Sequence, residues 1–256
     1  KTKGQIIATT HSSVALVEFD LSNIVVVRNN NGVVSCKSFS EEIKNQFQGT
    51  FRKVPEAFFS KKVIVCEGAT EFGFMLAFED YLVHQGFDNF GYQGVSVVDG
   101  KGDTFKQISK DLQLLGYETC VLIDSDKLME QEIQELIDSG VKVINWAGNV
   151  SIEERVFLDT PDNRLIELIQ LAKDILTEEM GEENASKSIL DSINNILEVK
   201  VLDLSSLNNL DNYRKELGKL AKKKEWFKRA DKGQKLGSVV FNYNEEIQEK
   251  DIVLKM

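Results

Sequence analysis

The sequence predicts an α/β fold, in which a Rossmann-like, mostly parallel sheet of four strands is flanked by helices and followed by a helical C-terminal extension. Strand-like and helix-like segments alternate between residues 62 and 147, which is the pattern of βαβ units. After Asn149 the strand pattern stops, and helical, highly charged segments follow. Acidic residues also recur where the predicted strands end, which is the edge at which such sheets place their sites.

Each element of the alternating region has a local signal. The first three strands are β-branched apolar runs that end in an acidic residue or a glycine. The helices between them carry apolar residues at helical spacing, and two of them stop at Gly86 and Gly116. The predicted strands are residues 62–67, 94–100, 119–126 and 141–147, and the predicted helices are residues 70–86, 103–116 and 129–140.

The chain after residue 150 is expected to be mainly helical. Ser151 is a favourable cap for a helix that carries Glu153 and Glu154 in its first turn. The helical segment is expected to extend from about residue 160 to about residue 230, and one late strand is expected after it. Its parts are an acidic helical region at 163–198, a basic helical region at 208–229 and the strand at 237–243, GSVVFNY.

A segment with different signals precedes the alternating region. Residues 4–9 are expected to form a short strand, and residues 21–39 two strands joined by a hairpin at Asn31-Gly32. The polar residues 40–60 are expected to connect this segment to the next domain. Because the chain has no initiator Met and opens inside a predicted strand, we expect a fragment of a longer protein. The predicted domains are residues 1–57 and residues 58–256.

The composition favours an ordinary soluble protein of the cytoplasm. Of the 256 residues, 42% are hydrophobic and 28% are charged. No apolar stretch approaches the roughly 18 residues of a membrane span, and the N-terminus has no signal-peptide pattern. We therefore expect no membrane partner. Cys36, Cys66 and Cys120 are odd in number and lack CxxC spacing, so they are expected to be reduced, mostly buried thiols.

Charge is distributed unevenly along the chain. The net charge is −10, which by itself argues against a nucleic-acid partner. Residues 214–235, however, contain ten Lys or Arg and three acids, so this segment is +7 and the remainder is −17. The segment predicts a polyanion docked at one place, although a solvated helix face is an equally good interpretation.

The acidic residues at strand ends form the most specific pattern. Glu67 and Glu71 are four residues apart across a strand-to-helix turn, and Asp124 and Asp126 are two apart at the end of the third strand. A further acid, Glu153 or Glu154, follows the fourth strand. Clustered carboxylates require cations, and hard oxygen ligands suit Mg²⁺ or Mn²⁺. Singly, each acid can equally end a strand or favour a helix N-terminus.

Two of these motifs resemble a known domain. VIVCEGATE (63–71) and VLIDSD (121–126), with VVDGKG (97–102) between them, resemble a TOPRIM domain, the metal-binding module of topoisomerases, primases and some nucleases. QIIATTHSS (5–13) resembles the end of an ABC-type ATPase domain. That order of domains resembles the OLD (overcoming lysogenization defect) family of ATP-dependent endonucleases, and EWFKRADKGQKLG (225–237) is similar to the family's C-terminal segment.

The resemblance implies a set of site residues. Glu153 matches the family pattern better than Glu154, which remains open, and Lys228 is the best match for a catalytic lysine, with Lys232 and Lys235 as rivals. His11 matches the histidine that senses the γ-phosphate, although a capping or core histidine is an alternative. The implied metal-site residues are Glu67, Glu71, Asp124, Asp126 and Glu153, and the implied catalytic residues are Glu67, Asp124, Asp126 and Lys228.

The predicted function is a metal-dependent DNA endonuclease that uses two Mg²⁺ or Mn²⁺ ions. The chain has no G-x-x-x-x-G-K-[ST] loop, so ATP is expected to bind only if an ATPase half is present. The resemblance also implies a homo-oligomer formed through the ATPase part, and a role in anti-phage defence. The alternatives are a scaffold or dimerisation module and a primase-like nucleotidyl transferase. The predicted DNA contacts are Lys222, Lys223, Lys224, Arg229, Lys232 and Lys235.

Overall fold

A four-stranded parallel sheet forms the centre of the protein. The computed structural model describes residues 4, 6–30, 32–39, 41–127, 129–197, 201–207 and 210–247. The strands lie in the order β4-β3-β5-β6, and every neighbouring pair is parallel. The predicted fold class is therefore confirmed. The strands are β3 (Lys62–Cys66), β4 (Val95–Asp99), β5 (Glu118–Leu122) and β6 (Lys142–Ile144).

The register brings the carboxyl ends of the strands to one edge. Cys66, the last residue of β3, lies opposite Asp99 of β4 and Leu122 of β5. Leu122 in turn lies opposite Ile144, the last residue of β6. Whatever follows these strands is therefore gathered in a small region, as the sequence predicts for a parallel sheet.

A separate apolar core covers each face of the sheet. On one face, Val63 and Val65 of β3 pack with Phe105 of α4 (Phe105–Leu114). On the other face, Cys66 packs with Phe74 of α3 (Ala69–His84). Successive strand residues point to opposite faces, so one apolar run supplies both cores. The third crossover helix is α5 (Glu130–Asp138).

The N-terminal segment packs on the α4 face of the sheet. The predicted hairpin is confirmed: β1 (Val25–Asn30) and β2 (Val33–Ser38) are antiparallel. Asn31 lies outside the described residues, and Gly32 has the positive φ, 88°, that such turns need. The strand predicted at residues 4–9 is wrong for residues 4 and 6–9, which have no regular structure. The helices here are α1 (Ser13–Val17) and α2 (Glu41–Lys53).

Helix α2 joins this segment firmly to the sheet. Phe51 is fully buried in the core that contains β3 and β5, and the Thr50 hydroxyl donates a 2.5 Å hydrogen bond to Asp111 of α4. The Arg28 guanidinium lies over the Tyr117 ring, 4.0 Å from its centroid. The apolar residues described between Leu16 and Phe58 thus contribute to a core that they share with the sheet. The boundary between residues 57 and 58 stays a prediction.

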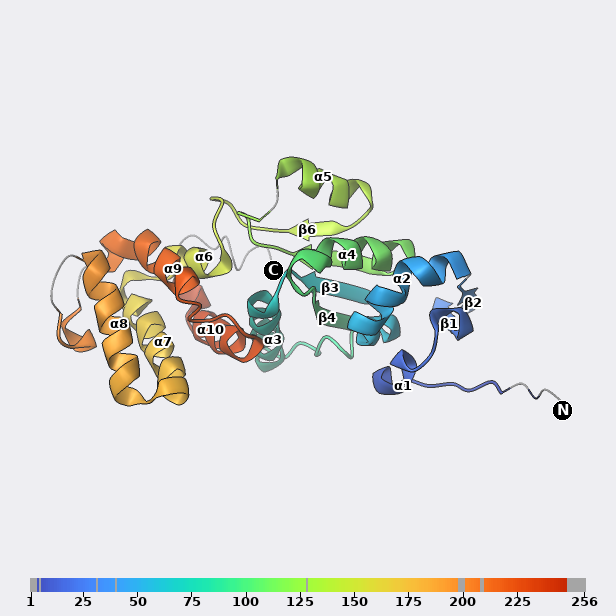
Figure 1. The fold of residues 1–256 in the computed structure, drawn as a ribbon, viewed down its shortest axis with the longest axis horizontal. Coiled ribbons are helices and arrows are strands. Elements are labelled where there is room, and N and C mark those ends of the chain that lie inside the picture. Colours follow the sequence, from blue (N-terminus) through green and yellow to red (C-terminus); the bar gives the residue numbers. More distant parts are fainter. Residues whose placement is uncertain are drawn as a thin grey trace.

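Helices make up the C-terminal extension, as predicted. Figure 1 shows α7 to α9 gathered at one end of the molecule, opposite the N-terminal hairpin. The predicted strand at residues 237–243 is wrong, because Gly237–Asn242 are the last turns of a helix in which Leu236, Val240 and Phe241 are buried at helical spacing. The helices are α6 (Ile152–Asp159), α7 (Leu165–Met180), α8 (Glu182–Leu197), α9 (Arg214–Lys223) and α10 (Ala230–Asn242).

Glycines allow α10 to cross α3 at backbone contact (Figure 1). A Cβ atom on Gly73 would lie 1.9 Å from the carbonyl oxygen of Ala230, and one on Gly233 would lie 2.3 Å from that of Thr70. No larger residue fits at either position without separating the helices. The extension is therefore fixed to the helix that carries Glu71.

Short 3₁₀ helices complete the described part of the chain. None of the helices described is long and apolar enough to cross a membrane. The cysteine prediction is right for Cys66, which is buried, but wrong for Cys36, which is exposed on β2; all three thiols are free. The 3₁₀ helices are η1 (Leu21–Asn23), η2 (Pro55–Phe59), η3 (Gly102–Thr104), η4 (Asp162–Arg164), η5 (Leu204–Ser206), η6 (Leu210–Tyr213) and η7 (Asn244–Glu246).

Candidate functional site

Glu67 connects the ends of the two central strands. It follows the last residue of β3, and its main-chain N–H donates a 2.9 Å hydrogen bond to the carbonyl of Leu122. Its carboxylate accepts a 3.2 Å hydrogen bond from the main-chain N–H of Asp124, two residues past β5. Burial raises the pKa of Glu67. The two acids predicted from separate motifs therefore lie side by side.

Glu71 lies near this pair, in the first turn of α3. Its side chain is buried and accepts a 3.0 Å hydrogen bond from the N–H of Gly68, which caps the helix. Burial raises its pKa to about 8, and the charges of Glu153 and Glu67 add to the effect. Glu71 thus has the capping role expected of an acid there, and it also belongs to the acidic cluster.

Asp124 also has a strongly raised pKa. Its carboxylate accepts a 2.8 Å hydrogen bond from the N–H of Ile152, the first residue of α6. Burial raises its pKa to about 10, and the charges of Glu71, Glu153 and Glu67 contribute. The cluster is therefore held between the sheet edge and α6.

The structure gives Glu153 and Glu154 different surroundings. Glu153 is buried, its pKa is raised mainly by burial, and its charge acts on both Glu71 and Asp124. Glu154 forms a capping box with Ser151, accepting a 3.1 Å hydrogen bond from the Ser151 N–H. This arrangement favours Glu153 as the fifth member of the cluster. The acidic edge, as used below, consists of Glu67, Glu71, Asp124, Asp126 and Glu153.

Two lysines contact the acidic edge. Lys127 Nζ lies 3.6 Å from Glu67 and 3.3 Å from Asp103. Lys222 Nζ, from the end of α9, is paired with Asp126 and lies 3.8 Å from Glu154. Lys127 is not among the site residues predicted from the sequence, although it directly follows the DSD motif, and Lys222 was predicted only as a DNA contact.

The donor chemistry of the acidic edge fits a hard divalent cation, but its carboxylates are turned to other partners. Carboxyl groups whose pKa values are raised by burial and by one another lack enough nearby positive charge to balance them. Within the described residues, no three His, Cys, Asp or Glu side chains converge closely enough to hold a metal ion. Glu67, Glu71 and Asp124 instead accept main-chain N–H groups.

Lys228 lies against the first turn of α3 but points to solvent. Trp226 and Phe227 are buried, as expected, and the Thr70 hydroxyl donates a 3.3 Å hydrogen bond to the carbonyl of Phe227. Lys228 Nζ pairs with Glu225 at 2.7 Å. The segment is thus near the acidic edge, while the ammonium group faces a neighbour in its own turn.

Three other predicted DNA contacts have acidic partners inside the extension. Arg229 and Lys232 contact Glu179 of α7, at 3.2 and 2.8 Å. Lys235 contacts Glu178 at 2.7 Å. Their charges are therefore largely neutralised within the protein, whereas Lys223 and Lys224 are exposed.

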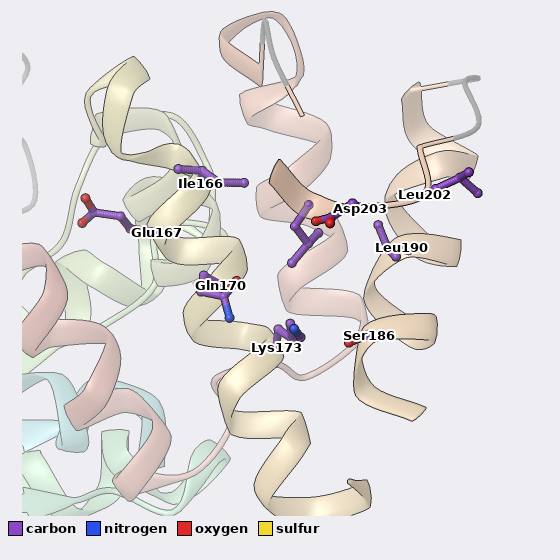
Figure 2. Close-up of a pocket in the computed structure, with 9 residues that line it drawn as sticks. Ile166, Glu167, Gln170, Lys173, Ser186, Leu190, Leu202 and Asp203 are labelled. Carbon is purple, nitrogen blue, oxygen red and sulfur yellow. The ribbon is translucent and has the colours of Figure 1, made fainter. Parts of the chain in front are cut away.

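His11 and a cavity in the extension lie apart from the acidic edge. His11 is exposed in a stretch without regular structure, so its switch role stays a prediction. A cavity of about 520 Å³ lies between α7 and α8 (Figure 2). Lys173 and Leu190 are among the residues that line it, and no predicted site residue does. We assign it no part in the site.

Comparison with known proteins identifies the domain. Residues 58–126 match the family described as "Overcoming lysogenization defect protein-like, TOPRIM domain". The chain is also 28% identical, over 174 residues, to the Old nuclease of Escherichia phage P2. This alignment covers 59% of the chain and 29% of the relative's length. No solved structure matches at comparable significance.

The four-stranded parallel sheet with acids at its strand ends is therefore consistent with a TOPRIM fold. More particularly, residues 58–126 match the OLD-like TOPRIM domain, and the chain is similar to an Old nuclease of whose length it spans 29%. The matched residues include Glu67, Glu71, Asp124 and Asp126, whereas Glu153 and Lys228 lie outside them. TOPRIM domains generally use divalent metal ions, and the relative that the chain matches is named a nuclease.

Proposed function

We propose that this chain is the catalytic part of an endonuclease that hydrolyses DNA phosphodiester bonds with two Mg²⁺ or Mn²⁺ ions. The observation that carries the proposal is the acidic edge. Burial raises the pKa values of Glu71 and Asp124, the neighbouring carboxylates add to the effect, and among the described residues Lys127 and Lys222 form ion pairs with the acidic edge. Such a cluster suits cations that the solution supplies.

The five carboxylates of the acidic edge would hold the ions. When bound, divalent ions stabilise the charge that develops on a phosphate under attack. The protein orients its acids through the main chain: the Asp124 N–H holds Glu67, and the Ile152 N–H holds Asp124. Loading therefore requires at least some carboxylates to exchange these N–H partners for a cation.

A lysine beside the phosphate would stabilise the same charge. We keep Lys228 in this role, supported by the burial of Trp226 and Phe227 and by the contact of Phe227 with Thr70. Lys222 is a second choice, because its ammonium group already contacts Asp126.

One observation favours a non-catalytic scaffold as the second function. In the described residues the carboxylates do not converge on one point, so the acidic edge would in that case serve structure alone. We also propose that residues 1–57 end an ATPase domain that mediates oligomerisation, with His11 near its nucleotide. The large apolar exposure of Ile6, Ile7 and Val14 supports a further packing partner there. Cytoplasmic location and anti-phage defence follow from this assignment.

Incubation with supercoiled plasmid tests the main proposal. We expect nicked or linear product with Mg²⁺ or Mn²⁺ and none with EDTA. Asp124→Asn should remove the activity, while Glu118→Gln, on the same sheet but at its opposite edge, should retain it. Calorimetric titration with Mn²⁺ distinguishes the two functions, because a scaffold would neither bind the ion nor cleave. Cleavage that persists in EDTA would contradict the proposal.

A further inference from the structure

Helix α9 carries a row of lysines that have no acidic partner among the described residues. Lys215, Lys219 and Lys223 are spaced four residues apart and are all exposed. Residues at this spacing lie on one side of a helix. No described residue forms an ion pair with any of the three. We call Lys215, Lys219 and Lys223 the α9 lysine row.

A neighbouring side of α9 is fixed against α6 and the acidic edge. Gly218 packs so closely on α6 that a Cβ atom there would lie 2.7 Å from the Cα of Glu154. One turn later, Lys222 pairs with Asp126. Lys219 directly follows Gly218 and Lys223 directly follows Lys222, each about 100° further around the helix. The row therefore runs alongside the acidic edge, over about 12 Å of helix.

The rest of the basic segment differs in its charge balance. Arg229, Lys232 and Lys235 are held by Glu178 and Glu179 of α7. Helix α9 has five bases and a single acid, Glu216, so it is +4 in a chain of net charge −10. A polyanion is repelled by most of this surface and attracted to α9. The positive charge that has no acidic partner thus lies beside the carboxylates that would hold the catalytic ions.

We propose that the α9 lysine row binds the phosphates of the DNA strand and so directs the backbone along the acidic edge. The inference rests on the proposed DNA substrate, and it adds Lys215 and Lys219 to the contacts expected from the sequence. It also removes Arg229, Lys232 and Lys235 from them. The partner is the phosphate backbone of DNA, read without base specificity.

Fluorescence anisotropy with labelled duplex DNA in EDTA, at several salt concentrations, tests the row. The variant is Lys215→Gln, Lys219→Gln and Lys223→Gln together. We expect the slope of log K against log salt to fall by up to about 2.7, which is about 0.9 for each phosphate contact. The matched control is Lys173→Gln, Arg229→Gln and Lys235→Gln, which removes the same charge from residues that have acidic partners.

The control variant should change the slope by less than about 0.9. Replacing the row by arginines should retain binding, since the charge is kept. If the glutamine variant fails to fold, Lys219→Gln alone should lower the slope by up to about 0.9. An unchanged slope, an equal loss in the control, or no binding by the unmodified chain would overturn the proposal. If the glutamine variant loses DNA binding but the unmodified chain never cleaves plasmid, the role of the α9 lysine row is supported and the nuclease proposal is refuted.

Discussion

The acidic edge and the basic segment 214–235 both concentrate charge of one sign, but folding treats them differently. Glu71 is buried and Asp124 is partly buried, and their pKa values rise to about 8 and about 10. Most of the bases remain at least partly exposed, where they either pair with acids, as Lys235 does with Glu178, or face solvent, as Lys223 does. Exposed charge costs little, whereas buried like charges are unfavourable without a counter-ion. The acids are therefore the stronger evidence of function.

The largest effect is expected from neutralising Asp124. Asp124→Asn keeps an oxygen to accept the Ile152 N–H and removes the charge. We expect the cleavage rate with Mn²⁺ to fall by at least about 10³, because a group central to charge stabilisation is lost. The free energy of unfolding in EDTA should change by less than about 1 kcal/mol, because the raised pKa keeps Asp124 largely protonated without a metal, and an amide has nearly the same shape. Rates come from plasmid assays and stability from urea titration.

Glu118→Gln serves as the control for that variant. Glu118 starts β5 and pairs with Lys142 at the far edge of the sheet, so its loss should leave the rate unchanged. A severe loss of stability in Asp124→Asn, with normal specific activity in the folded fraction, would show that the acidic edge is structural.

The next effect concerns the two lysines near the site. We expect Lys228→Ala to lower the single-turnover cleavage rate by about 10²–10³ while DNA affinity changes by less than about tenfold. Lys232→Ala and Lys235→Ala, which lose pairs with α7, should cleave at nearly the normal rate. Rapid-quench kinetics with saturating protein separates the rate from binding.

Lys222→Ala decides where the catalytic lysine lies. If this variant loses the rate while Lys228→Ala keeps it, the ammonium group that contacts Asp126 performs the role, and the placement at Lys228 is wrong. Normal cleavage by both variants would require the positive charge to come from another group, of which Lys127 is the nearest to Glu67.

The architecture of the sheet region was predictable because its signals are local. Apolar runs of strand length alternate with helical periodicity, and glycines mark the turns. The secondary-structure predictions that proved wrong were made where the sequence signal was short or mixed. Residues 237–243 contain two adjacent valines, which favour a strand. Leu236, Val240 and Phe241, however, follow the helical period and pack in the core that contains Phe74 of α3. At residues 4–9 an apolar run exists without a described neighbour to pair with, and a strand needs one.

The site was predictable only in part. The acids at strand ends follow from topology, since parallel strands bring their carboxyl ends together. The partners of the bases do not, because Lys222 meets Asp126 across 96 residues, and Arg229 meets Glu179 across 50. Such contacts depend on how α9 and α10 pack. The choice between Glu153 and Glu154 likewise depended on the capping box that Glu154 forms with Ser151.

A pH effect should distinguish the buried acids from the exposed bases. An acid whose pKa is raised by folding binds more protons when folded, so its stabilising contribution is present below its unfolded pKa and lost as pH rises through the folded value. For Glu71 this window extends from its ordinary 4.5 to about 8. We expect stability in EDTA to fall across it, by at most about 1.4 kcal/mol per pH unit for each retained proton.

Urea titrations from pH 5 to 8 measure this slope. Glu71→Gln keeps an acceptor for the Gly68 N–H and removes the titrating group, so its slope should be shallower than that of the unmodified chain. Glu118→Gln should retain the full slope. A slope that is unchanged in Glu71→Gln would mean that this carboxyl group is ionised in the folded protein throughout.

The smallest effect is expected from moving α9 without changing its charge. A Cβ atom on Gly218 would lie 2.7 Å from the Glu154 Cα, so Gly218→Ala must shift backbone against backbone. We expect a loss of about 1–3 kcal/mol in the free energy of unfolding. Gly49→Ala, in α2 with nothing within 4 Å of the added atom, should be neutral or stabilising by up to about 1 kcal/mol.

Gly218→Ala also separates the amount of charge on α9 from its position. The variant keeps every lysine, so the salt dependence of DNA binding should stay close to normal. Cleavage should fall, because α9 moves away from Glu154 and carries Lys222 away from Asp126. Normal cleavage in a destabilised Gly218→Ala variant would show that the acidic edge acts without α9. Loss of binding and cleavage together would indicate that the lysine row works only when α9 lies against α6.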